Sequence, residues 1–244
     1  MKDLKIEIKM QKDEECLSEC LFSVIKYYGI NVIIDDIIFS ISNNSDKLYD
    51  WEFKAGNFAL NNGLKSTIYT NVSYLFDPSW HNLDNNKLLE KMKKEAKYFY
   101  KRAEEINKEP EQKNYIFPNK FIAERYKKEI DAAIGYVENN GNILFDPISK
   151  DLIKSLLNRE VPVIVSINPA LLHRMKRAYN FKPDDIRGSA WGHVIIISGY
   201  DGNDFIIADP GGDFYSGAFK YSMNMDRVVE SILRYNGQMI VIEK

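Results

Sequence analysis

The sequence predicts an α+β protein in which helices pack on an antiparallel sheet, and three patterns support this prediction. Residues 16–29 repeat apolar side chains at spacings of three and four, which is typical of an amphipathic helix. Residues 193–208 place two apolar runs on either side of an Asp-Gly-Asn-Asp turn, as in a β-hairpin. Residues 84–140 contain two long helical patterns, which predict an inserted helical hairpin.

Length and composition bound the remaining possibilities. With 244 residues, of which 45% are hydrophobic, we expect one domain over residues 1–244, with the helical insertion at about 84–140. A net charge of -2 gives no electrostatic reason to bind nucleic acid or a membrane surface, so we expect neither partner. No stretch approaches the roughly 20 apolar residues of a membrane-spanning helix, nor a secretory signal, so we expect a cytoplasmic protein.

The first half of the chain predicts a strand followed by helices. The period-two alternation of residues 4–10 predicts a strand that ends near Gln11. The cysteine-containing helix is expected to stop at Gly29. Beyond it we expect a connection and a helix over residues 30–39, a helix over 51–60, a strand over 64–69 and a proline-containing turn over 75–80.

The inserted hairpin has its own start signal. Asp84 is expected to cap a helix over residues 85–107, and a second helix follows over 119–138. Pro110 and Pro118 bracket the connecting loop. The lysines of the first helix are offset by glutamates, which favours a solvent-exposed face over a site for an anionic partner.

The second half of the chain alternates helices with apolar strands. Ser149 is expected to cap a short helix that ends at Asn158. Residues 161–167 form a continuous apolar run typical of a buried strand. Residues 180–190 are polar and irregular and deliver His193 to the start of a core strand. The returning strand over 205–208, a helix over 225–235 and a strand over 238–242 complete the prediction.

The two cysteines are predicted to be reduced. Thiols four residues apart on one helix project in parallel, which does not suit the narrow geometry of a disulfide. A metal site is the less favoured alternative, because His81 and His173 would have to converge from unconnected segments. We therefore expect no metal and no cofactor.

The arrangement of three residues predicts nucleophilic chemistry. Cys16 lies in the first turn of its helix, where the helix dipole favours a thiolate. His193 is a candidate base, and Asp209, at the end of the next strand, is a candidate for fixing its tautomer. Gln11 and the backbone N–H of Cys16 would hold the developing oxyanion.

Each of these residues also has a structural interpretation. A cysteine in an amphipathic helix is usually a small core residue, a histidine before a strand is often structural, and Asp-Pro-Gly-Gly is usually a turn. A two-residue hairpin turn would moreover place Asp209 opposite Ile196, so contact with His193 requires a bulge or another register. The order of the three signals along the chain nevertheless favours the chemical interpretation.

The same residues carry a family resemblance. The chain has Gln11, then Cys16 on a helix that ends in Tyr-Tyr-Gly, then Gly-His before an apolar strand, and Ala-Asp-Pro at residues 208–210. This pattern resembles the C39-like peptidases of the papain-like cysteine protease superfamily. Gln11 precedes Cys16 by five positions, one fewer than is usual there, and Leu17 stands where glycine is common. Residues 77–80 and 184–188 are similar to a longer bacterial branch often associated with ATP-grasp ligases.

The resemblance implies a papain-like fold and a set of roles. Cys16 would be the nucleophile, His193 the general base, Asp209 the orienting acid and Gln11 the oxyanion residue, while Cys20 would be a core residue. The implied function is hydrolysis of a peptide or isopeptide bond in a peptide or protein substrate. Two alternatives stay open: an acyltransferase or transglutaminase-like enzyme that uses the same residues, and a noncatalytic peptide-binding module.

Overall fold

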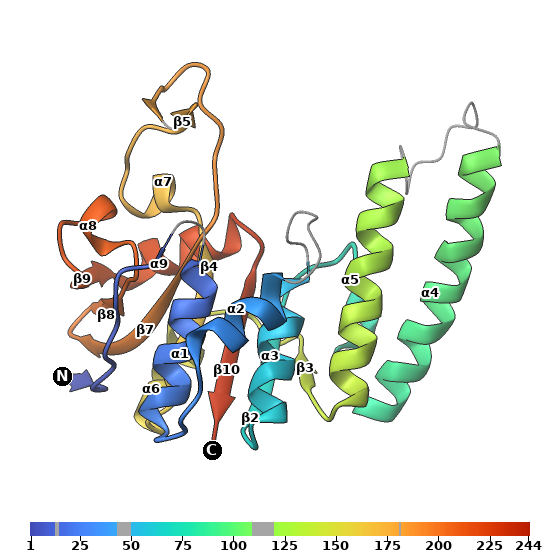
Figure 1. The fold of residues 1–244 in the computed structure, drawn as a ribbon, viewed down its shortest axis with the longest axis horizontal. Coiled ribbons are helices and arrows are strands. Elements are labelled where there is room, and N and C mark those ends of the chain that lie inside the picture. Colours follow the sequence, from blue (N-terminus) through green and yellow to red (C-terminus); the bar gives the residue numbers. More distant parts are fainter. Residues whose placement is uncertain (13–14, 43–49, 109–119, 181) are drawn as a thin grey trace.

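One mostly antiparallel sheet forms the centre of the molecule (Figure 1). The computed structural model describes residues 1–12, 15–42, 50–108, 120–180 and 182–244. Within these ranges, eight strands join in the order β3-β2-β10-β4-β7-β8-β9, with β1 paired to β7. The pair β2 and β3 is parallel and the other pairs are antiparallel. The strands are β1 Lys2–Asp3, β2 Lys65–Thr70, β3 Asn142–Leu144, β4 Val163–Ile167, β7 His193–Asp201, β8 Asp204–Ala208, β9 Lys220–Asn224 and β10 Gln238–Glu243.

Helices cover both faces of this sheet. In Figure 1, α1, α2 and α3 lie in front of the strands, while α6 and α9 lie behind them. Accordingly, every residue of the central strand β4 is buried. The helices are α1 Cys16–Tyr27, α2 Ile34–Ser42, α3 Trp51–Asn61, α4 Asn85–Lys108, α5 Lys120–Glu138, α6 Lys150–Asn158, α7 Pro169–Leu172, α8 Gly212–Tyr215 and α9 Met225–Leu233, with a 3-10 turn η1 at Pro78–Asn82. The predicted α+β class is confirmed.

Helix α1 buries one face against the sheet, as its amphipathic pattern predicts. Its residues Leu21, Val24 and Ile25 are fully buried against the sheet. The helix ends as predicted at Gly29, which has a φ of 76°. There the N–H of Gly29 bonds to Lys26 and that of Ile30 to Ile25, so two carbonyls of the last turn are satisfied. The apolar residues of the sequence therefore determine which face of α1 is buried, and Gly29 determines where the helix ends.

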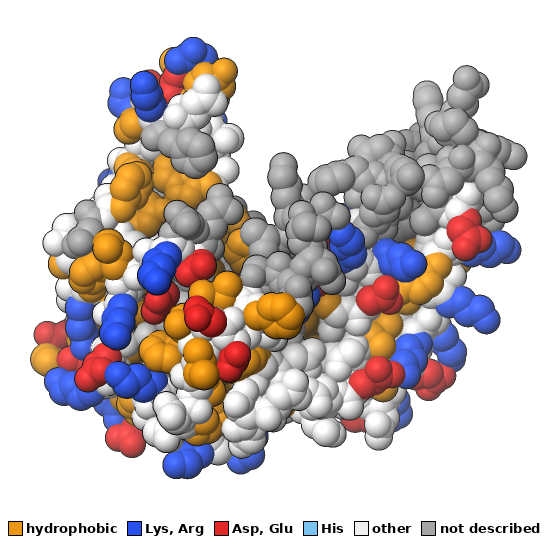
Figure 2. Space-filling view, in the orientation of Figure 1, with side chains coloured by type: hydrophobic (Ala, Val, Ile, Leu, Met, Phe, Trp, Pro, Cys, Tyr) orange, Lys and Arg blue, Asp and Glu red, His pale blue; other side chains and the backbone are white. Residues whose placement is uncertain are grey.

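The helices α4 and α5 pack side by side as a hairpin beyond the β3 edge of the sheet (Figure 1). Asp84 accepts a hydrogen bond from the N–H of Lys87, as expected of an N-cap. Leu88 and Met92 of α4 and Ile130 of α5 are buried in a second core, which also includes side chains of α3, β2 and β3. Figure 2 shows charges of both signs on this arm. The loop bracketed by Pro110 and Pro118 lies outside the described residues.

The strand predicted over residues 4–10 is wrong. Only Lys2–Asp3 pair with β7, and the N–H of Leu4 bonds to the Ser198 carbonyl at 2.8 Å. The N–H of Ile6 then bonds to the carbonyl of Leu4, and this tight turn ends the pairing. The alternation in the sequence reflects the burial of Leu4 and Ile6 without a strand partner.

Residues 178–183 contain a second small departure from the prediction. Strands β5 Ala178–Tyr179 and β6 Lys182–Pro183 form a two-stranded ladder in a stretch expected to be irregular from residue 180.

Within the described ranges of the chain, no helix is both long and apolar enough to cross a membrane.

Candidate active site

A β-bulge sets the positions of His193 and Asp209. The β7–β8 register pairs Gly199 with Ile206 but Ile197 with Ile207, so Ser198 is an extra residue in β7. Without this residue Asp209 would lie opposite Ile196, whose side chain points to the other face of the sheet from His193. The bulge moves Asp209 opposite Ile195, on the same face as His193. The bulge required by the sequence pattern is therefore present.

Asp209 and His193 form a short, buried hydrogen bond. His193 Nε2 lies 2.6 Å from Asp209 Oδ1, and both side chains are almost fully buried. The same oxygen accepts the N–H of Gly211 at 2.8 Å. Burial alone would raise the pKa of Asp209, but the hydrogen bonds from His193, Tyr221 and Gly211 lower it overall. Asp209 is thus held as a carboxylate that faces the imidazole.

Cys16 is the first residue of α1, and its side chain interacts with that of His193. Because Asp209 occupies Nε2 of the ring, Nδ1 is the nitrogen left for the thiol. Burial lowers the pKa of His193, but the hydrogen bond with Asp209 and the interaction with Cys16 raise it to about 9. An imidazolium at neutral pH is the counter-ion that a cysteine thiolate needs.

Gln11 lies beside the chain segment that follows Asp209. Its backbone N–H donates to the carbonyl of Pro210 at 3.0 Å, and its side chain is half-buried. This bond ties the segment before α1 to the β8 end that carries Asp209. The structure therefore brings all four predicted residues, Gln11, Cys16, His193 and Asp209, to one end of the sheet.

Cys20 lies one turn further along α1 in a different environment. It is fully buried, and its thiol donates a 3.5 Å hydrogen bond to the backbone carbonyl of Val194. Burial raises the pKa of Cys20 well above its usual range. The prediction that Cys20 is a core residue is confirmed.

Two polar residues behind Asp209 escaped the sequence prediction. The hydroxyl of Tyr221 donates to Asp209 Oδ2 at 2.8 Å. Nε2 of His173 lies 3.3 Å from the same hydroxyl, so His173 must donate because the tyrosine proton is already used. Tyr221 lies on β9, between the strand predicted over 205–208 and the helix predicted over 225–235, where no strand was expected. The alternation of Tyr221 and Met223 was the available signal.

Aromatic rings line the other side of His193. The ring centroids of Tyr215 and His193 lie 4.6 Å apart, and the Tyr215 hydroxyl oxygen accepts a hydrogen bond from Trp191 Nε1 at 3.0 Å. Gly192 leaves room for Tyr235, because a Cβ there would lie 1.9 Å from the tyrosine oxygen. These contacts fix the imidazole between its hydrogen-bond partners.

The remaining histidine, His81, forms no hydrogen bond with the candidate active site among the described residues. His81 lies in η1 and contacts Pro78 and Asn82. Among the residues that the structure describes, no three or more histidine, cysteine or acidic side chains are grouped as metal ligands would be. His173, in contrast, contacts the Asp209 network, which its sequence context did not indicate.

Comparisons with known proteins concern the family and the fold of the chain. The model of the Peptidase_C39-like family matches residues 4–237. A solved structure described as a C39-like peptidase from Bacillus anthracis superposes with a TM-score of 0.52 at 10% identity, covering 100% of this chain and 98% of that one. A double glycine motif protease from an AMS/PCAT transporter, in complex with the leader peptide, gives a TM-score of 0.43 at 12% identity over 99% and 94% of the two chains. No curated protein matches the chain.

Proposed function

Since the chain belongs to the Peptidase_C39-like family, we propose that it is a cysteine peptidase that hydrolyses a peptide or isopeptide bond. The observation that supports this most is the 2.6 Å contact between His193 Nε2 and Asp209 Oδ1, next to a cysteine at the start of a buried helix. A histidine held in this way has one ring nitrogen available for the thiol. That is the minimum arrangement for an activated cysteine nucleophile.

The proposed reaction has two steps. In the first, Cys16 Sγ attacks the carbonyl carbon, the C–N bond breaks, and His193 gives its proton to the leaving amine. In the second, His193 takes a proton from water, the resulting hydroxide attacks the thioester, and the acid product leaves with Cys16 restored. The Gln11 side-chain amide and the Cys16 N–H would stabilise the oxyanion in both steps.

Asp209 has a positioning role in this proposal. Its carboxylate holds the imidazole in the orientation that presents Nδ1 to the thiol, and its charge stabilises the imidazolium. Hydrogen bonds from Tyr221 and Gly211 hold the carboxylate in turn. The chemistry also requires a reduced Cys16, which the reducing cytoplasm would maintain.

We further propose that residues 1–244 form a single domain in which the α4–α5 hairpin is an insertion. The hairpin shares its core with α3, β2 and β3, so it is packed onto the sheet that carries the site. The hairpin would either bind part of the substrate or stabilise the domain. The proposed partner is a peptide or protein.

A cleavage experiment tests the proposed function. The protein is incubated with a cell lysate, and new peptide N-termini are identified by mass spectrometry. We expect cleavages that require Cys16 and are absent with Cys16→Ala, while Cys20→Ala serves as the matched control and retains them. Cleavage that survives in Cys16→Ala would contradict the assignment.

An added primary amine separates hydrolysis from acyl transfer. Hydrolysis predicts free carboxylates at the new C-termini even when the amine is present in excess. Amides formed with the amine, in place of carboxylates, would support the acyltransferase alternative instead.

A further inference from the structure

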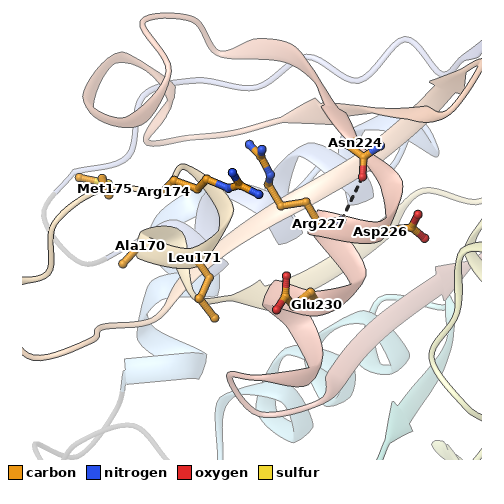
Figure 3. Close-up of a pocket in the computed structure, with 8 residues that line it drawn as sticks. All are labelled: Ala170, Leu171, Arg174, Met175, Asn224, Asp226, Arg227 and Glu230. Carbon is orange, nitrogen blue, oxygen red and sulfur yellow. Dashed lines mark hydrogen bonds between the residues drawn. The ribbon is translucent and has the colours of Figure 1, made fainter.

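A pocket of about 440 Å³ lies between the turn after α7 and the first turns of α9 (Figure 3). Arg174 enters it from the α7 side and Arg227 from α9, and Figure 3 shows the two guanidinium groups directed toward each other. We infer that this pocket binds an acidic group of the peptide substrate, a few residues from the bond that is cleaved. Only the identity of the occupant rests on the proposed function. The affinity of the pocket for an anion does not.

The charges around the pocket leave the arginines without an anionic partner. Two carboxylates also line the pocket, but Asp226 pairs with Lys150 at 3.0 Å and Glu230 pairs with Arg234 at 3.0 Å. Within the described part of the chain, neither Arg174 nor Arg227 forms an ion pair. Arg227 instead donates a weak 3.7 Å hydrogen bond to the sulfur of Met223.

Two guanidinium groups in one pocket repel each other unless an anion lies between them. A carboxylate accepts two parallel N–H bonds from a guanidinium, and this geometry makes arginine the usual residue for recognising carboxylates. A small polar group at the pocket wall, the Asn224 side chain, is already used to cap α9 through the N–H of Arg227. The arginines are therefore the groups left to bind a ligand.

The backbone at Arg174 provides an independent observation. Arg174 has a φ of 51°, in the left-handed region that glycine normally occupies after a helix. The N–H of Met175 bonds to the Ala170 carbonyl at 3.1 Å, which closes the end of α7 around this residue. Arginine thus occupies a position where glycine would be less strained, and its side chain is held toward the pocket (Figure 3).

The pocket adjoins the candidate active site through two aromatic rings. Arg174 directly follows His173, whose ring stacks on Tyr215 with centroids 5.6 Å apart. Tyr215 in turn contacts His193. An extended peptide advances roughly 3.3 Å per residue, so a substrate that followed these ring contacts from His193 towards Arg174 would span them with a few residues.

Anisotropy of a fluorescently labelled hexaglutamate peptide tests the inference. The measurement uses the Cys16→Ala chain, so its outcome does not depend on whether the protein is a peptidase. We expect hexaglutamate to bind and hexaglutamine not to bind. Replacing both pocket arginines, Arg174→Gln with Arg227→Gln, is expected to weaken binding at least tenfold, and the two Arg→Lys changes are expected to weaken it less.

The matched control removes two positive charges elsewhere. Lys97→Gln with Lys101→Gln on α4 makes the same change in net charge, and we expect binding within about twofold of the parent protein. Equal weakening by both pairs of substitutions, or equal binding of hexaglutamine, would overturn the inference. Displacement of the peptide by stoichiometric inorganic phosphate would also overturn it, because the occupant would then be a small free anion.

Arg174→Gly separates a binding role from a structural one. Glycine relieves the left-handed backbone, so we expect the thermal unfolding midpoint to stay the same or rise while hexaglutamate binding weakens severalfold. A fall in the unfolding midpoint with unchanged binding would show that Arg174 serves the fold, and would contradict its role in the pocket.

Discussion

Cys16 and Cys20 lie one turn apart on α1 and meet consecutive residues of β7 in different ways. Cys16 faces the side chain of His193, whereas the Cys20 thiol bonds to the backbone carbonyl of Val194. The first partner is a base held by a carboxylate, and the second is a main-chain group that cannot take a proton. We propose that this difference in partner, which is set by the strand that the helix packs on, makes Cys16 the reactive thiol and Cys20 a structural one.

The largest expected effect separates the two thiols by substitution. Cys16→Ala is expected to lower kcat/KM by about 10⁴-fold or more, because the nucleophile is lost, and to leave the fold intact. Cys20→Ala is expected to retain most activity and to lower the free energy of unfolding by roughly 1 kcal/mol, because it leaves a small cavity in the core. Turnover and urea denaturation measure the two effects. Full activity in Cys16→Ala would reverse the assignment.

The next effect concerns His193, the proposed base that faces Cys16. With the pKa of His193 raised to about 9, the imidazolium persists through neutral pH and is lost as the pH rises through about 9. We therefore expect kcat/KM to fall above that pH. In Asp209→Ala the hydrogen bond that raises the pKa of His193 is gone while burial still lowers it, so the alkaline limit should move to lower pH. kcat/KM should also fall by about 10² or more.

The raised pKa of His193 also makes the stability of the protein depend on pH. A histidine whose pKa is raised on folding stabilises the protein below its unfolded pKa, near 6.5, and this contribution is lost as the pH rises through about 9. Asp209→Ala should flatten this part of the stability profile. An alkaline limit that does not move in Asp209→Ala would separate Asp209 from His193 and weaken the comparison.

A smaller effect is expected from the residue that holds Asp209. Tyr221→Phe removes one hydrogen bond to a charged group, worth roughly 1.5 kcal/mol, which corresponds to about a tenfold loss of kcat/KM. The matched control is Tyr200→Phe on β7, which removes an exposed hydroxyl that donates to the Asn158 side chain of α6. We expect that variant to stay within about twofold. Equal losses in the two variants would show that the effect of Tyr221 is not specific to the site.

Much of the fold and the candidate site could be predicted because their signals are local. The amphipathic pattern of α1, its glycine end and the caps Asp84 and Ser149 are each contained within a few residues, and the structure confirms them. Cys16, His193 and Asp209 were predicted for the same reason. Each lies at an end of an element that its own sequence defines.

The parts that escaped prediction depend on pairing between distant segments. A bulge or another register was expected between β7 and β8, but the position of the bulge, at Ser198, arises from how the two strands fit, so no local pattern marks it. Tyr221 and His173 come from short segments that are far apart in the sequence and meet only in the folded chain. The alternation of residues 4–10 reflects the burial of alternate side chains. Such burial occurs in strands and also in extended segments that do not pair with a strand, so the pattern alone could not distinguish the two.

The rate of alkylation of the two thiols tests the central claim most directly. Iodoacetamide is applied at neutral pH, and fragment-ion mass spectrometry locates the adduct on Cys16 or Cys20. The account predicts rapid, stoichiometric labelling of Cys16, little labelling of Cys20, and loss of the rapid phase in His193→Ala. Slow and equal labelling of both cysteines would contradict it.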